Sequence, residues 1–323
     1  MSGLSVGLQR RGVAIPLVHD VSLDVGAGER LGIVGESGSG KSLTMLAVMG
    51  LLNPPLCATG GSIVLEGKEL LAGGDAALRR ARGVAMGMIY QDPMTSLNPM
   101  IRIGTQVAEG LRAHGVGRDE ARERSRKALI EVGLTDAHKV ERLYPHQLSG
   151  GMRQRVMIAS ALVTAPKLLI ADEPTTALDV TIQRQILRLV AKLQKERNMA
   201  VVWATHDLGV VAQFAHRVAV MYAGRVVEIA PTRSLFRQPE HPYSAALLGS
   251  LPSRATPGKA RMNQIPGIPP DPTRLPVGCP FHPRCAQATQ RCRVESPALT
   301  ERRSGSMAAC FVPPENWTRQ NRP

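Results

Sequence analysis

Eight residues, from Gly35 to Ser42, have the types and spacing of a phosphate-binding loop. They read Gly-Glu-Ser-Gly-Ser-Gly-Lys-Ser and directly follow the largely apolar run 30–34. A strand before such a loop and a helix after it bring backbone N–H groups and a positive helix end to the phosphates of a nucleotide. Lys41 would neutralise the β- and γ-phosphates, and Ser42 would donate a hydroxyl ligand to Mg²⁺. The sequence therefore predicts a site for a nucleoside triphosphate and Mg²⁺, formed by Gly35, Ser37, Gly38, Ser39, Gly40, Lys41 and Ser42.

Two adjacent carboxylates follow a second apolar strand pattern. Residues 167–172 read Lys-Leu-Leu-Ile-Ala-Asp, and Glu173 comes next. Asp172 would hold Mg²⁺ through its coordination shell, and Glu173 would polarise a water for in-line attack on the γ-phosphate. An acidic turn without catalytic work is the alternative interpretation, and the phosphate loop upstream argues against it.

Strand and helix patterns alternate along the chain and must position these residues. Strands are predicted at 17–25, 30–34, 61–67, 167–172 and 200–205, and helices at 41–52, through most of 106–164 and at 180–197. This alternation predicts an α/β fold with a parallel sheet covered on both faces and ligands at the carboxyl ends of the strands. After about residue 238, Pro, Arg and Cys become frequent and periodicity is weak, so a domain boundary is predicted there.

Composition narrows the class of protein. The 323 residues suit one large or two modest domains, and 43% hydrophobic with 20% charged residues is ordinary for a globular protein. A net charge of +14 fits either a nucleic-acid surface or an anionic membrane face. Four Phe, four Tyr and two Trp are too few to suggest stacking on single-stranded bases, so no nucleic-acid partner is expected. Neither a membrane-spanning stretch nor a signal peptide is recognisable, which favours a cytosolic protein.

Four further motifs stand in the order and spacing found in one family. They are Gln91 in Tyr-Gln-Asp-Pro, the sequence Leu-Ser-Gly-Gly-Met-Arg-Gln-Arg at 148–155, Asp179 in Thr-Ala-Leu-Asp, and His206 in Ala-Thr-His-Asp. With the phosphate loop, they make residues 4–240 resemble the ATPases of ABC transporters.

The resemblance implies a fold and its boundaries. An ABC ATPase domain at 1–237 would comprise a P-loop NTPase (RecA-like) core, 1–90 and 159–237, with a helical signature subdomain inserted at 91–158. Residues 238–323 would form a small irregular extension.

The resemblance also implies roles for the matching residues. Ser149, Gly150 and Gly151 would contact the γ-phosphate held by the phosphate loop of an opposite subunit, and Asp179 would lie across that dimer interface. Gln91 would link Mg²⁺ and the γ-phosphate to movement of the helical subdomain, and His206 would hold the γ-phosphate and the attacking water in line. The implied catalytic set is Glu173, His206 and Gln91.

Two departures from the family pattern affect the nucleotide site. Met152 stands where the signature commonly has glutamine. The first predicted hairpin also lacks the aromatic residue that usually stacks on adenine, and Val13 or Ile15 would have to pack against the base instead.

Three classes of protein share this ATPase core. Exporters often fuse it to membrane helices, which are not recognisable here, and chromosome or repair ATPases carry a long insertion for which the interval from Gln91 to Ser149 is too short. The stretches 91–99, 144–156, 240–248, 267–270 and 278–285 resemble the ATPases of dipeptide, oligopeptide and nickel importers.

The importer resemblance implies ATP-driven import of peptides by a subunit bound peripherally to the cytoplasmic face of the membrane. Its partners would be a second, related ATPase forming a heterodimer, two membrane permeases and an extracytoplasmic binding protein. The alternatives are an importer of the same type carrying nickel or another small solute, and a soluble ABC ATPase acting on nucleic acid or ribosomes.

Four of the five cysteines, Cys279, Cys285, Cys292 and Cys310, lie close together in the extension. Their spacing is looser than the paired cysteines of most zinc sites. Four thiolates also suit a [4Fe–4S] cluster, which some members of this importer group carry. We expect a structural [4Fe–4S] cluster that staples the extension, with Zn²⁺ and free thiols as alternatives. Cys57 is interpreted as a packed residue.

Overall fold

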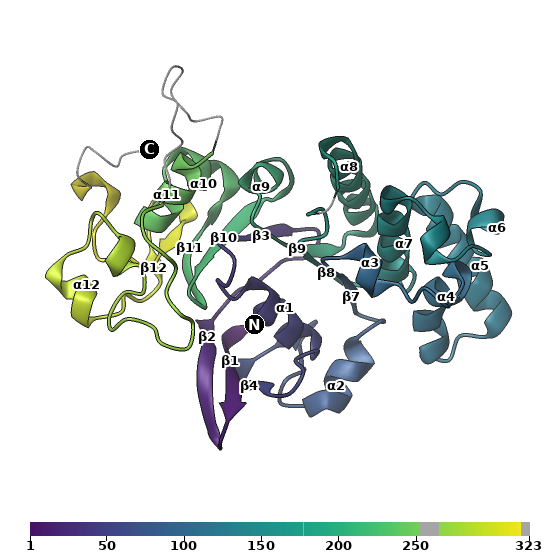
Figure 1. Ribbon diagram of the computed structural model, residues 1–323, viewed down its shortest axis with the longest axis horizontal. Helices are drawn as coiled ribbons and strands as arrows, with labels where there is room; N and C mark the ends of the chain where they lie inside the picture. Colours follow the sequence, from purple (N-terminus) through teal and green to yellow (C-terminus); the bar gives the residue numbers. More distant parts are fainter. Residues whose placement is uncertain (177, 252–264, 318–323) are drawn as a thin grey trace. The chain divides into compact units, whose positions relative to one another are not determined.

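The structure is a computed structural model that describes residues 1–176, 178–251 and 265–317 (Figure 1). The chain divides into two compact units. The first comprises Met1–Asp24, Leu31–Glu69 and Thr205–Pro323, and the second comprises Val25–Arg30 and Leu70–Ala204. The predicted turn at 176–179 includes Ala177, and the predicted extension includes 252–264 and 318–323, which lie outside the described residues.

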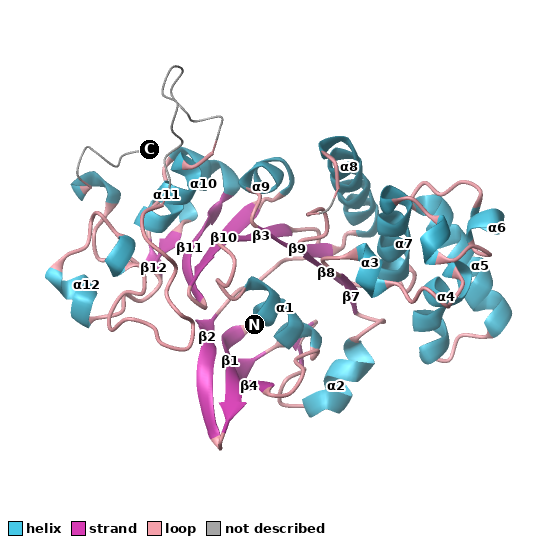
Figure 2. Cartoon of the chain, in the orientation of Figure 1, coloured by secondary structure: helices cyan, strands magenta, loops and turns pink. Residues whose placement is uncertain are grey.

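An antiparallel sheet opens the first unit. Its strands are β1 (Ser2–Arg10), β2 (Val13–Val21) and β4 (Leu56–Ser62), in the order β2-β1-β4 (Figure 2). The buried side chains Leu4, Val6 and Val18 give this sheet an apolar face. The observed strand β2 begins and ends earlier than the strand predicted at 17–25. Its pairing with β1 runs from Val13 to Val21. A short hairpin, β5 (Val64–Leu65) and β6 (Lys68–Glu69), follows.

A second sheet of the first unit carries the phosphate loop. In spatial order its strands are β12 (Thr300–Glu301), β13 (Met307–Ala308), β11 (Arg225–Pro231), β10 (Arg217–Tyr222) and β3 (Arg30–Val34). β3 and β10 are parallel, whereas β10, β11 and β13 pair antiparallel. The extension thus contributes two strands to the sheet and is less irregular than predicted. The sequence does not reveal these strands, because a two-residue strand is too short to show a periodic pattern.

Helices of the first unit lie along this sheet and in the extension. They are α1 (Lys41–Met49), α9 (Leu208–Phe214), α10 (Thr232–Arg237), α11 (Pro242–Gly249) and α12 (Gln290–Val294). α1 ends three residues before the predicted end, because Gly50 takes the left-handed conformation at φ 62° and caps the helix. One buried cluster joins Val220 and Val227 of the sheet to Tyr243 of α11 and Phe281 of the extension.

Three parallel strands form the sheet of the second unit. They are β9 (Ala200–Thr205), β8 (Leu168–Asp172) and β7 (Met86–Ile89), and every residue of all three is buried. The predicted strand at 200–205 is confirmed at its bounds, and β8 begins one residue later than predicted. Buried parallel strands read as continuous apolar runs, which is why β8 and β9 are legible in the sequence, whereas β7 was not predicted.

The helices of the second unit include the region predicted to be mostly helical. They are α2 (Gly74–Ala81), α3 (Pro93–Ser96), α4 (Ile103–Ala113), α5 (Arg118–Glu131), α6 (Ala137–Val140), α7 (Gly150–Leu162) and α8 (Val180–Arg197). α4, α5 and α7 pack against one another (Figure 1). The bounds predicted for α8 are confirmed.

An ion cluster around the buried Glu141 fastens the loop before the signature motif to α5. Glu141 accepts hydrogen bonds from Arg126 Nε at 2.7 Å and from Arg122 Nη2 at 2.8 Å. The Arg126 guanidinium, helped by Arg122, holds the pKa of Glu141 at about 2 against the desolvation that opposes it.

Candidate nucleotide-binding site

The phosphate loop connects β3 to α1, as predicted. Gly38 and Gly40 lie at φ 77° and 100°, where a side chain would strain the backbone, and Gly40 is the N-cap of α1. A Cβ on Gly35 would stand 2.2 Å from the carbonyl oxygen of Met221. The glycines are therefore required by the shape of the loop, whereas the exposed Ser37 is not constrained in this way.

Lys41 runs beneath this loop. Its Nζ donates to the carbonyl oxygens of Gly35 at 2.8 Å and Glu36 at 3.1 Å, and the residue is 5% exposed. Ser39 is also buried, and the half-buried Ser42 follows Lys41 in the first turn of α1. A held ammonium group at the start of a helix can neutralise phosphate oxygens without a large loss of side-chain entropy.

The two predicted carboxylates stand at the carboxyl end of β8. Asp172 is the last residue of the strand and is 6% exposed. Glu173 has φ 44°, and its N–H donates to the Ala204 carbonyl at 2.8 Å. Positive φ is uncommon for a residue with a side chain and often marks functional positions. The backbone turn makes consecutive carboxylates different in burial and in partners.

Two polar side chains meet the Glu173 carboxylate. Gln91 Nε2 lies 3.4 Å and Thr176 Oγ1 lies 3.1 Å from Glu173 Oε2. The structure thus brings together two of the three predicted catalytic residues. Thr176 was not singled out from the sequence, although its place three residues after Glu173 in the Thr-Ala-Leu-Asp motif was the available signal. These contacts restrict the rotamers of a carboxylate that would orient water.

The signature residues stand at the start of helix α7. Ser149 is the N-cap of α7, and its hydroxyl accepts from the N–H of Met152 at 3.3 Å. Ser149 and Gly150 are exposed, and a Cβ on Gly150 would meet nothing within 4 Å. Gly151 lies against Ile182 of α8. An exposed helix N-terminus without bulky side chains can receive a phosphate.

Asp179 and His206 occupy different kinds of positions. Asp179 caps α8, and its Oδ1 accepts from the N–H groups of Thr181 and Ile182, both at 2.9 Å. His206 is exposed in the turn between β9 and α9. It lies in the first unit, with the phosphate loop, whereas Gln91 and Glu173 lie in the second.

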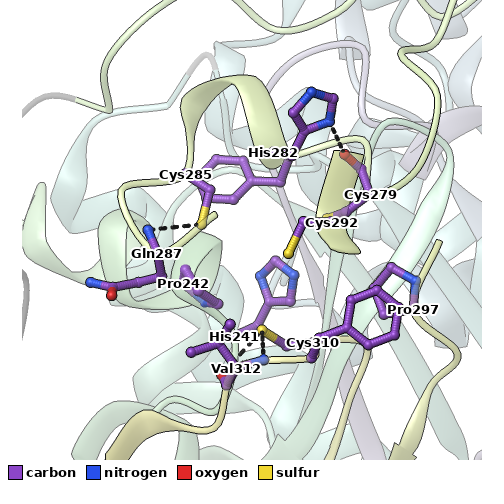
Figure 3. A pocket seen from close by; sticks show the side chains of 12 residues that line it. His241, Pro242, Cys279, His282, Cys285, Gln287, Cys292, Pro297, Cys310 and Val312 are labelled. Carbon is purple, nitrogen blue, oxygen red and sulfur yellow. Dashed lines mark hydrogen bonds between the residues drawn. The ribbon is translucent and has the colours of Figure 1, made fainter. Parts of the chain in front are cut away.

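The four extension cysteines line one cavity with His241 and Phe281. Figure 3 shows the labelled cysteines around this space, with His241 among them. All five cysteines of the chain are free thiols. Within residues 1–176, 178–251 and 265–317, however, no group of three or more His, Cys, Asp or Glu side chains is arranged to hold a metal ion. The structure therefore gives the predicted metal centre no direct support.

Burial and hydrogen bonding act in opposite directions on these thiols. Burial raises the pKa of Cys285 to about 12 and that of Cys310 to about 11, and it also raises the pKa of Cys279. Backbone N–H groups nevertheless point at three of the sulfurs: Gln287 at Cys285 and Val312 at Cys310, both 3.4 Å, and Thr289 at Cys292, 3.5 Å. These N–H donors are placed to stabilise thiolates.

Comparisons with known proteins match both regions of the chain. Residues 18–176 match the family model described as ABC transporter, and 227–292 match that of the oligopeptide/dipeptide transporter C-terminal region. The oligopeptide transport ATP-binding protein OppD of Salmonella typhimurium is 50% identical over 93% of this chain and 89% of its own length. The chain belongs to the ATP-binding subunits of peptide ABC transporters. It is thus an ATPase whose hydrolysis of ATP, with Mg²⁺, is coupled to transport.

Other relatives agree with this family. The dipeptide transport ATP-binding protein DppD of Escherichia coli is 46% identical over 96% of this chain and 95% of its own. A dimeric ATP-binding cassette solved in a post-hydrolysis state with ADP and Pi is 28% identical, with a TM-score of 0.63 over 72% of this chain and 97% of its own. Subunits of this family work with membrane permeases. No helix in the described part of this chain is long and apolar enough to cross a membrane.

Proposed function

We propose that this chain hydrolyses ATP to power the import of peptides through two membrane permeases. The observation that carries the proposal is the Glu173 carboxylate, held at positive φ after a buried strand and contacted by Gln91 and Thr176. A carboxylate fixed in this way suits orientation and deprotonation of an attacking water.

Each of the nucleotide motifs has a role in the proposed reaction. The loop residues Gly35, Ser37, Gly38, Ser39 and Gly40 bind the phosphates through backbone N–H groups, and Lys41 neutralises them. Ser42 and Asp172 hold Mg²⁺, which offsets charge on the β- and γ-phosphates, with Gln91 at its edge. Glu173 takes the proton of the attacking water, and His206 keeps the water and the γ-phosphate in line.

A second ATPase subunit completes the proposed site. Ser149, Gly150 and Gly151 of one subunit bind the γ-phosphate held by the other, with Asp179 at the interface. The exposure of Ser149 and Gly150 supports this, because N–H groups at an exposed helix N-terminus are accessible to a phosphate. We place the pair, as a heterodimer, on the cytoplasmic face of the membrane beneath the permeases, which receive substrate from an extracytoplasmic binding protein.

The test of this function is peptide-stimulated ATP hydrolysis by the assembled transporter. The chain is co-purified with the permeases and the second ATPase, and reconstituted in vesicles with the binding protein. Oligopeptides should stimulate hydrolysis several-fold and accumulate across the membrane. Stimulation by Ni²⁺ instead would identify the nickel alternative, and stimulation by RNA or ribosomes without permeases would overturn the importer proposal.

We further propose that Cys279, Cys285, Cys292 and Cys310 hold a [4Fe–4S] cluster. The donor set supports it, since four thiols line one cavity and N–H groups point at three sulfurs. A single Zn²⁺ needs four sulfurs at about 2.3 Å from one point. In a [4Fe–4S] cluster each of four thiolates binds a different iron, so the four sulfurs need not converge on one ion. The bound cluster would staple the loops of the extension together.

Analysis of anaerobically purified protein tests the cluster. Absorption near ~400 nm with about four iron and four sulfide per chain is expected. Stoichiometric zinc would show that the four cysteines bind Zn²⁺ and not a cluster. The absence of both metals would show that they are free thiols. The ATPase assignment is independent of all three outcomes.

A further inference from the structure

The C-terminal extension reaches the phosphate loop through one buried arginine. Arg284 Nη1 donates to Glu36 Oε2 at 2.7 Å, and Nη2 donates to Oε1 at 3.0 Å. Two parallel contacts of this kind form the bidentate pair for which guanidinium and carboxylate groups are matched. The Arg284 side chain is 4% exposed and that of Glu36 is 26% exposed. This ion pair is therefore more than a solvated surface contact.

Glu36 is the second residue of the phosphate loop, and the rest of it is also fixed. Its N–H donates to the hydroxyl oxygen of Tyr243 at 2.9 Å. Its carbonyl oxygen accepts from Ser39 N at 3.2 Å and from Lys41 Nζ at 3.1 Å. The same residue thus joins the extension to the lysine that neutralises phosphate.

Arg284 is itself held from several sides. Its Nε donates to the carbonyl of Pro266 at 2.8 Å, and its guanidinium lies 5.8 Å from the centre of the Tyr222 ring. The rings of Tyr222 and Tyr243 are 4.6 Å apart, and Phe281 packs edge-on against both. A guanidinium is not deprotonated in proteins, so Arg284 stays charged. An aromatic wall therefore fixes a permanent positive charge next to the loop.

The cysteine-bearing segment determines where Arg284 lies. Arg284 ends a short 3-10 helix, His282–Arg284, that directly precedes Cys285. Cys279 stands at the other end, where its carbonyl oxygen lies 3.0 Å from both His282 N and His282 Nδ1. The chain between two of the cavity cysteines is thus the support from which Arg284 reaches Glu36.

We infer that Arg284 is a positioning residue for ATP binding, acting through Glu36. A nucleoside triphosphate is strongly anionic, so a bare carboxylate in its binding loop weakens binding by Coulomb repulsion. Arg284 offsets this charge and fixes the carboxylate, while Tyr243 fixes the backbone of the same residue. The inference rests on the proposed ATP site and adds to it a residue from outside the ATPase motifs.

The test measures the Kd of a fluorescent ATP analogue for the full-length chain. Arg284→Gln removes the charge and retains a hydrogen-bonding group, so binding should weaken by about tenfold. The double variant Arg284→Gln with Glu36→Gln removes the repulsion, and should bind within about threefold of the original chain. If Arg284 only stabilised the fold, the second substitution would remove a further polar contact and would not restore binding. Restored binding in the double variant therefore separates this role from a purely structural one.

Arg303→Met is the matched control. Arg303 is also in the extension and pairs with Glu315 at 3.0 Å, but its side chain is 69% exposed. The Kd of the Arg303→Met variant should equal that of the original chain. An unchanged Kd in Arg284→Gln, or a double variant as weak as the single one, overturns the inference.

Folding and the function itself are checked separately. If Arg284→Gln does not fold, Glu36→Gln tests the same repulsion from the other side. It should bind ATP at least as tightly as the original chain, and binding about tenfold weaker overturns the inference. If the unaltered chain does not bind ATP, the proposed function fails, whereas normal binding with unaffected variants rejects only the role of Arg284.

Discussion

The nucleotide motifs and the C-terminal extension position their functional side chains in different ways. In the motifs, each residue stands at the end of an element: Gly40 and Ser149 cap helices, and Glu173 follows a strand. In the extension, Arg284 is held by a residue 248 positions away, and Cys292 lies in the short helix α12, where the Thr289 N–H donates to its sulfur. Substitutions in the motifs should therefore change chemistry with little effect on folding, whereas substitutions in the extension should act through the integrity of the whole segment.

The largest effect is expected from Glu173→Gln. The amide cannot take a proton from water, and loss of a general base costs about 10²–10⁴ in rate. The variant should still bind ATP and should show the same thermal midpoint of unfolding, because Gln preserves the shape of the side chain. The kcat of ATP hydrolysis by the assembled transporter measures the first effect, and thermal unfolding measures the second.

Glu196→Gln is the control for this variant. Glu196 lies on α8 and pairs with Lys192 at 3.8 Å, with 54% of its side chain exposed. Its kcat should equal that of the unaltered protein. Turnover by Glu173→Gln within a few-fold of normal would reject the role assigned to this carboxylate.

A cysteine substitution tests the C-terminal extension, the second region of the comparison. Cys292 is 7% exposed and receives the Thr289 N–H at 3.5 Å. Cys292→Ser should lower bound iron from about four to less than one per chain, because a cluster that loses one thiolate ligand is poorly held. The thermal midpoint should fall with it. Iron analysis and thermal unfolding under anaerobic conditions measure both.

Cys57→Ser gives the matched comparison, since Cys57 lies on β4, outside the extension. It should keep its iron and its thermal midpoint. Equal loss of iron from both variants would show that the metal does not belong to the four extension cysteines.

The same contrast explains what could be predicted from the sequence. The bounds of α8 were legible because Asp179 caps its start and Asn198, at φ 46°, ends it. Likewise, Lys41 and Glu173 could be assigned because motif and element coincide. The pair of Arg284 with Glu36 could not, because the two residues are 248 positions apart and only tertiary packing brings them together. Short strands such as β13 were also missed, because they carry no periodic pattern.

An ion cluster in the second unit should affect stability and not ATP binding. Arg126 and Arg122 hold the pKa of Glu141 at about 2, below the ordinary 4.5. The ionised carboxylate therefore stabilises the fold fully above about pH 4.5, and this contribution is lost as the pH falls toward 2. Glu141→Gln should lower the free energy of unfolding at pH 7 by about 1–2 kcal/mol, and the difference should shrink in acid.

Chemical denaturation at several pH values measures this difference. Glu120→Gln serves as the control, because Glu120 pairs with Arg124 at 3.4 Å on an exposed surface and should matter little at any pH. A difference between Glu141→Gln and the unaltered chain that is independent of pH would contradict the ion-cluster explanation.

The smallest effects come from two helix caps that have similar structural roles. Ser149 caps α7 through Met152 N at 3.3 Å, and Asp136 caps α6 through Lys139 N at 3.2 Å. Replacing either with Ala should lower the free energy of unfolding by about 1 kcal/mol. Only Ser149→Ala should also slow ATP hydrolysis by the assembled transporter, since Ser149 alone is proposed to contact nucleotide on the opposite subunit. Equal rates of ATP hydrolysis in the two variants would show that Ser149 acts only as a helix cap. They would also contradict the proposed place of the signature helix in the shared site.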